Sequence, residues 1–163
     1  MNYIKEYFNK LETGEIITSK RVYNVYKKLV YNIDNPDAFI FDEKKADRPI
    51  EFIERFCKHS KGEWAGKPIK LELFQKAYIN ALFGFVDRET GLRKYRESLF
   101  YVARKNGKST MLAGIALYMM IADGEAGADC YSTATKKDQA KIIFDEVCHM
   151  VQQSPELKRY IKK

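Results

Sequence analysis

The residue types that bind nucleotide phosphates come together in one short run of the sequence, Arg104-Lys105-Asn106-Gly107-Lys108-Ser109-Thr110. Gly107 lets the backbone approach a phosphate, and the N–H groups at the start of a following helix point at the anion. Lys108 can then reach the β- and γ-phosphates, and the Ser109 hydroxyl can ligate Mg²⁺. The run therefore predicts a binding site for ATP and Mg²⁺.

The segments on either side of this run are those that a phosphate-binding loop requires. Glu97 to Ala103 is a nearly continuous apolar stretch, typical of a strand buried on both faces, and Lys108 to about Ala122 has the pattern of a helix. The usual motif has a glycine five residues before Gly107, where this chain has Val102. The alternative is a basic, exposed turn between a strand and a helix.

The remaining elements predict an α/β fold with a helical N-terminal region. Apolar residues recur at helical spacing over residues 3–11, 19–34, 49–59, 71–85 and 136–153. Ala128 to Thr133 is expected to be a second strand, and Asp87 to Gly91 a turn. The glycine- and proline-containing loop from Lys61 to Lys70 is the best boundary, which divides the chain into residues 1–60 and 61–163.

Composition excludes several classes of protein. The 163 residues are enough for one core, and 29 Lys plus Arg against 22 Asp plus Glu give a net charge of +7, which suits a polyanionic partner. The three cysteines, Cys57, Cys130 and Cys148, have no regular spacing, so a reducing compartment is expected. No stretch has the length of a membrane span or the pattern of a signal peptide, and we expect a cytoplasmic protein.

Several motifs in order resemble one family. The run from Lys61 to Val147 resembles the ATPase portion of the large terminase subunit of tailed bacteriophages, the motor that packages DNA into the procapsid. The likeness rests on the Leu71, Phe74 and Gln75 helix, the phosphate loop, and the helix that opens with Asp138-Gln139-Ala140. The Phe41-Asp42 pair and the segment HSKG, residues 59–62, are also similar to the family's lead-in.

This resemblance implies roles for further residues. Gln75 would read adenine, with a surface position on an amphipathic helix as the alternative. Arg104 would stand beside the γ-phosphate as an arginine finger, with a salt bridge or a DNA contact as the alternative. Lys105, Asn106 and Thr110 would complete the phosphate cradle around Gly107, Lys108 and Ser109. The implied fold is the start of a P-loop, RecA-like parallel sheet, incomplete in this chain.

The resemblance also implies partners and a missing part of the catalytic site. The partners are double-stranded DNA, a small terminase subunit, a portal protein and further copies in a ring, in the cytoplasm of a bacterial host. The Walker B aspartate and the catalytic glutamate lie further downstream in the family, as does the nuclease domain. We therefore expect the full-length protein to be an ATPase, and this chain alone to bind nucleotide weakly and hydrolyse it poorly.

Two other patterns could be mistaken for functional motifs. Ile142 to Glu146 reads like a strand ending in Asp-Glu, but its apolar residues continue at helical spacing, which predicts a helix with Asp145 and Glu146 on its exposed side. The Cys57/His59 and Cys148/His149 pairs offer four zinc ligands at spacings unusual for zinc sites.

Two other functions stay open: a fragment of another P-loop DNA translocase or helicase, and a catalytically inactive assembly or DNA-docking module.

Overall fold

The computed structural model describes residues 2–161, which form two compact units that interleave along the sequence. The first unit contains the described residues up to Ile50 together with Leu71–Phe100, and the second contains Glu51–Lys70 together with the described residues from Tyr101. Each unit combines two separate stretches of the chain, so no single boundary in the sequence separates them. The division into functional regions near residue 60 stays a prediction.

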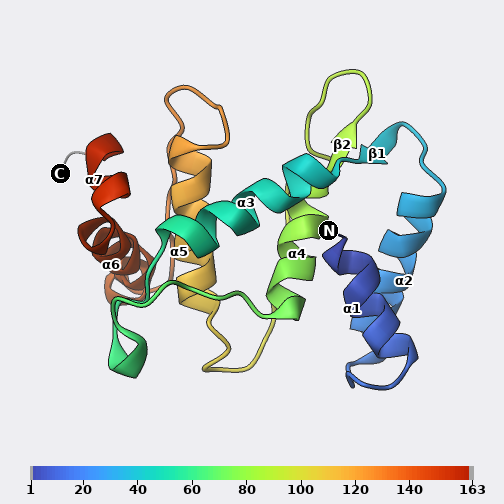
Figure 1. Ribbon diagram of the computed structural model, residues 1–163, viewed down its shortest axis with the longest axis horizontal. Coiled ribbons are helices and arrows are strands. Elements are labelled where there is room, and N and C mark those ends of the chain that lie inside the picture. Colours follow the sequence, from blue (N-terminus) through green and yellow to red (C-terminus); the bar gives the residue numbers. More distant parts are fainter. Residues whose placement is uncertain (1, 162–163) are drawn as a thin grey trace. The chain divides into compact units, whose positions relative to one another are not determined.

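The first unit is a group of helices with a short sheet (Figure 1). Its elements are α1 (Tyr3–Glu12), α2 (Lys20–Asp34), β1 (Phe39–Phe41), the start of α3 (Glu43–Phe56), α4 (Leu73–Gly84) and β2 (Phe85–Asp87). Helix α1 contacts both α2 and α4, and the core between these elements consists of Ile4, Tyr7, Leu11, Tyr26, Leu29, Ala77 and Phe85. The predicted helices over residues 3–11 and 19–34 are confirmed.

Buried polar contacts fix α1 and α3 against α4. The side-chain oxygen of Asn80 accepts a hydrogen bond from the backbone N–H of Tyr3 at 3.1 Å, and its amide nitrogen donates to the carbonyl of Ala46 at 3.0 Å. Asn80 is fully buried, so each of these bonds removes the cost of an unpaired polar group in the core.

The predicted turn after β2 is also confirmed, because Asp87 accepts a hydrogen bond from the backbone N–H of Thr90 at 2.8 Å.

The second unit contains the C-terminal part of α3, a 3₁₀ turn (Gly62–Trp64), α5 (Lys108–Ile121), α6 (Lys137–Gln153) and α7 (Pro155–Tyr160). Figure 1 shows α5 and α6 as neighbours, and residues of the two helices contact each other. The predicted helices from Lys108 and from Lys136 are confirmed to within one residue at their starts.

Four basic residues lie close together near the C-terminal end of the sequence. Lys158 and Arg159 lie in the last turn of α7, whereas Lys162 and Lys163 lie outside the described residues.

Helix α3 begins six residues earlier than the sequence predicts. The apolar spacing placed the expected start at Pro49, but in the structure Pro49 lies inside a helix that begins at Glu43. The side chain of Asp42 accepts a hydrogen bond from the backbone N–H of Lys45 at 3.0 Å, and this bond caps the true start.

Neither predicted strand, over residues 97–103 or 128–133, forms a ladder in the described part of the chain. The only sheet found there pairs β1 with β2 antiparallel, Ile40 opposite Val86. A strand needs a hydrogen-bonded neighbour about 4.8 Å away, and both segments lack one here. The expected parallel sheet is therefore not seen, and the coarser α/β assignment holds.

The segment before the phosphate loop is nonetheless held in place on one side. The ring of Phe100 lies 4.5 Å from that of Tyr78 and stacks with Phe74, and the hydroxyls of Tyr78 and Ser98 are 2.7 Å apart. Leu99 and Tyr101, which alternate with Phe100, are 88% and 93% exposed. The alternation is that of a strand whose second face is uncovered.

Among the described residues no helix is long and apolar enough to cross a membrane. These residues also contain no group of three or more His, Cys, Asp or Glu side chains placed to hold a metal ion. Burial raises the pKa of the Cys57 thiol to about 12, which disfavours the thiolate that zinc requires.

Candidate phosphate-binding site

The loop before α5 has the backbone shape of an anion-binding nest. Gly107 is the residue before the first turn of α5 and adopts the left-handed conformation, with φ +67° and ψ +18°. Lys105 is also left-handed, with φ +68°, the one non-glycine residue with positive φ among those described. Left-handed residues at such a turn direct successive N–H groups to one side, where an anion can bind.

Asn106 supports this loop from within. Its side-chain amide nitrogen lies 3.2 Å from the carbonyl oxygen of Ala103 and 3.3 Å from that of Arg104, and donates to both. These bonds direct two carbonyl groups toward Asn106. They fix the turn that follows the extended segment, so Asn106 contributes to the shape of the nest rather than to its charge.

The first turn of α5 supplies the remaining donors. Its regular hydrogen bonding begins where the backbone N–H of Met111 donates to the carbonyl of Gly107 at 2.9 Å. The N–H groups of Lys108, Ser109 and Thr110 precede that point, and helix geometry gives them no acceptor within the helix. They carry the positive end of the helix dipole, which favours a bound anion.

The cationic side chains of the loop differ in exposure. Arg104 and Lys105 are exposed, whereas Lys108 is half-buried and donates from Nζ to the carbonyl oxygen of Val102 at 2.8 Å. Ser109 and Thr110 are half-buried in the first turn of α5. The structure thus brings the whole predicted run, from Arg104 to Thr110, into one turn and one helix start.

Gln75 is a buried residue of the first unit, and the sequence-based alternative of a surface position is wrong. It is 6% exposed, and its side-chain oxygen accepts a hydrogen bond from the backbone N–H of Glu72 at 3.0 Å. Together with the Glu72 side chain it forms a capping box at the start of α4. Gln75 therefore has a clear structural role, and its contact with adenine stays a prediction.

Sequence reasoning missed the role of Glu146. The segment around it is helical, as predicted, but Glu146 is half-buried rather than exposed. Its carboxylate accepts a hydrogen bond from the Ser60 hydroxyl at 2.7 Å and lies 3.4 Å from the Thr110 hydroxyl. The spacing contained the signal, because Glu146 is three residues after Ile143 and four before the buried Met150.

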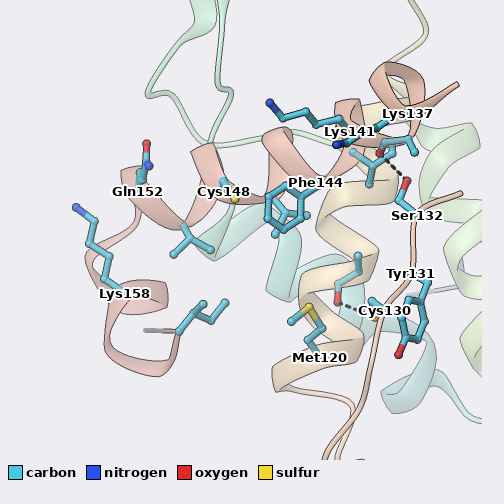
Figure 2. Close-up of a pocket in the computed structure, with 16 residues that line it drawn as sticks. Met120, Cys130, Tyr131, Ser132, Lys137, Lys141, Phe144, Cys148, Gln152 and Lys158 are labelled. Atoms are coloured by element: carbon cyan, nitrogen blue, oxygen red, sulfur yellow. Dashed lines mark hydrogen bonds between the residues drawn. The ribbon is translucent and has the colours of Figure 1, made fainter. Parts of the chain in front are cut away.

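One pocket of the second unit is separate from the phosphate loop. Figure 2 shows this pocket, of about 1060 Å³, and its lining comes mostly from α5, α6 and residues 130–132. Hydrogen bonds hold that short segment in place, from Ser132 Oγ to the carbonyl of Ala140 at 2.9 Å and from Cys130 Sγ to that of Ala116 at 3.7 Å. The lining is mainly apolar, so this pocket does not suit a phosphate.

Comparison with known proteins relates the chain to one family. A model of the family described as terminase large subunit, ATPase domain, matches residues 73–163, more than half of the chain. The large terminase subunit of Enterobacteria phage HK97 is 33% identical over 118 residues, which are 72% of this chain and 22% of that protein. The crystal structure of the HK97 bacteriophage large terminase matches with a TM-score of 0.57 at 33% identity, over 72% of this chain and 23% of that one. This chain thus spans less than a quarter of the length of these relatives.

Proposed function

Because the chain belongs to the family of the terminase large subunit and matches its ATPase domain, we propose that it binds ATP with Mg²⁺ at the loop from Arg104 to Thr110. The geometry of this loop is the observation that supports the proposal. Two left-handed residues and a helix start direct N–H groups to one place, and three cations lie within five residues of sequence. ATP carries the negative charge that such a place favours.

Each residue of the loop has a role in this proposal. The N–H groups of Gly107 to Thr110 surround the phosphates, Lys108 turns its ammonium group toward the β- and γ-phosphates, and the Ser109 hydroxyl ligates Mg²⁺. Arg104 is exposed at the loop and offers its charge to the γ-phosphate. The donor set, a hydroxyl together with phosphate oxygens and water, is of the oxygen type that Mg²⁺ prefers. Gln75 would read adenine.

We further propose that residues 97–103 and 128–133 are strands of a parallel sheet in the intact ATPase domain. The exposed Leu99 and Tyr101 support this, because a central strand of such a sheet is covered on both faces. Tyr131 in the second segment is also exposed, and the apolar pocket lies beside it. Additional strands and helices would cover these surfaces.

At the level of the whole protein, we propose a motor that couples ATP hydrolysis to the translocation of double-stranded DNA. The family membership supports this, and so does the net charge of +7, which favours a polyanion. A small terminase subunit, a portal protein and further copies of the chain are the proposed partners. Residues 1–60 would form a helical lead-in to an ATPase region that begins near residue 61.

Titration of the chain with MgATP tests the nucleotide site. We expect measurable binding to the unaltered chain and at least about a tenfold loss in Lys108→Ala, since a charge-assisted phosphate contact is removed. Lys158→Ala, which removes an equal charge from α7, is the matched control and should bind normally. Equal affinity in all three proteins would reject the site.

A further inference from the structure

A second set of polar contacts lies beside the phosphate loop, and the proposed function does not use it. Glu146 of α6 accepts a hydrogen bond from Ser60 through Oε2 at 2.7 Å, and its Oε1 has a longer contact of 3.4 Å with the Thr110 hydroxyl. Both contacts are partly buried. One carboxylate thus connects α6 with two segments that are 86 and 36 residues away in sequence.

The segment that carries Ser60 is well fixed. The backbone N–H of His59 donates to the carbonyl of Lys67 at 3.0 Å, and that of Ile69 donates to the carbonyl of Cys57 at 3.1 Å. Lys58 and Pro68 also form an isolated β-bridge. Since Glu146 makes its shorter bond to this segment, its carboxylate is anchored at one end and contacts the start of α5 at the other.

The start of α5 is a place where such an anchor matters. The first turn of a helix has fewer hydrogen bonds than its middle and opens more readily. Thr110 follows Ser109 directly, so a bond that limits the motion of Thr110 also limits that of its neighbour. The N–H groups proposed to bind phosphate belong to this same turn.

We propose that Glu146 is a positioning residue, which holds the first turn of α5 to the segment around Ser60 and so keeps the phosphate loop in its binding shape. The effect on nucleotide affinity rests on the proposed function above. The effect on α5 itself does not, and it can be measured in the chain without nucleotide.

Two substitutions separate positioning from charge. Glu146→Ala removes both contacts, whereas Glu146→Gln removes the charge and keeps both, because the amide oxygen accepts from Ser60 and the amide nitrogen donates to Thr110. Positioning predicts that the Gln variant behaves like the unaltered chain. A purely electrostatic role, in which the carboxylate repels phosphate, predicts tighter nucleotide binding in both variants and would overturn the proposal.

Hydrogen exchange of the Met111 amide tests the first step, because this amide makes the first regular bond of α5. In the chain without nucleotide we expect Glu146→Ala to exchange at least about threefold faster and Glu146→Gln to stay within about twofold of the unaltered rate. Asp145→Ala, the neighbouring carboxylate on α6, is the control and should leave the rate unchanged. An unchanged rate in Glu146→Ala overturns the proposal.

MgATP titration of the same proteins tests the consequence. We expect about a tenfold loss of affinity in Glu146→Ala and near-normal affinity in Glu146→Gln. Normal affinity in Glu146→Ala would overturn the positioning role. If the unaltered chain and Lys108→Ala both fail to bind, the proposed function fails, while the exchange rates still decide whether Glu146 holds α5. Should Glu146→Ala not fold, as circular dichroism would show, Ser60→Ala removes the shorter bond and is expected to give the same two results.

Discussion

The ammonium group of Lys108 donates a hydrogen bond to the carbonyl oxygen of Val102 at 2.8 Å. Val102 precedes the phosphate loop and Lys108 begins α5, so this bond closes the loop between them. An ammonium group has three donors and can turn one or two of them to a phosphate while it keeps the carbonyl. The side chain proposed to bind phosphate therefore also holds the loop in shape.

Replacement of Lys108 by Met should separate these two roles. The unbranched stem is largely kept, so we expect the free energy of unfolding to fall by only about 1 kcal/mol for the lost hydrogen bond. MgATP affinity should fall at least about tenfold. Urea unfolding and calorimetric titration measure the two quantities, and a loss of stability above about 3 kcal/mol would instead mark Lys108 as mainly structural.

The left-handed backbone of Lys105 makes a prediction about the shape of the loop. A β-branched residue is strained at φ +68°, whereas glycine is not. We expect Lys105→Val to be about 1 kcal/mol less stable than Lys105→Gly, and to bind MgATP more weakly although both lack the charge. Comparison of the two variants by urea unfolding and titration cancels the effect of charge. Equal behaviour would show that the left-handed turn is not needed.

Helices could be predicted from this sequence because their contacts are local. In α1 and α2 the apolar residues three and four positions apart, such as Ile4 with Tyr7 and Tyr26 with Leu29, do form the core. The side chains of the caps Asn2 and Ser19 each accept a hydrogen bond from the backbone N–H three residues further on, again within the range of a short window. The turn and helix start from Arg104 to Thr110 were predictable for the same reason, whereas their binding of phosphate stays a prediction.

Contacts between distant segments could not be predicted in the same way. Strands β1 and β2 are three residues each and pair across more than forty residues, which gives no periodic signal. The expected strands around Phe100 and Tyr131 depend on neighbours that their own residues do not specify. The spacing of Glu146 from Ile143 and Met150 could have placed it on the inner face of α6, but it does not say that Ser60 lies opposite.

Packing of α5 on α3 gives a prediction about stability. A methyl group added at Gly114 would lie 2.9 Å from Cγ1 of Ile53, too close for two carbon atoms. We therefore expect Gly114→Ala to lower the free energy of unfolding by about 1–2 kcal/mol despite the better helix propensity of alanine. Combined with Ile53→Val, which removes one of the crowding atoms, the loss should be smaller than the sum of the single losses. A stabilising Gly114→Ala would contradict the packing described.

Thiol reactivity should follow burial. Burial raises the pKa of Cys57 to about 12, so at pH 8 this thiol is protonated and covered. Cys130 is exposed, although desolvation, with the charges of Asp129 and Glu125, also raises its pKa. In a Cys148→Ser background we expect one fast reaction with a thiol reagent, which accelerates as pH rises and does not level off at the ordinary thiol pKa because that of Cys130 is raised. A second reaction should appear only after unfolding. Fast labelling of Cys57 in the folded chain would contradict its position in the core.

The central claim is that the backbone N–H groups from Gly107 to Thr110 bind the phosphates of ATP. The amide chemical shifts of a ¹⁵N-labelled chain, recorded during addition of MgATP and of MgAMP, test it most directly. We predict that the largest shifts with MgATP occur from Lys105 to Met111, and that MgAMP produces much smaller ones because it lacks the β- and γ-phosphates. Shifts of equal size with both nucleotides, or shifts confined to other parts of the chain, would contradict the claim.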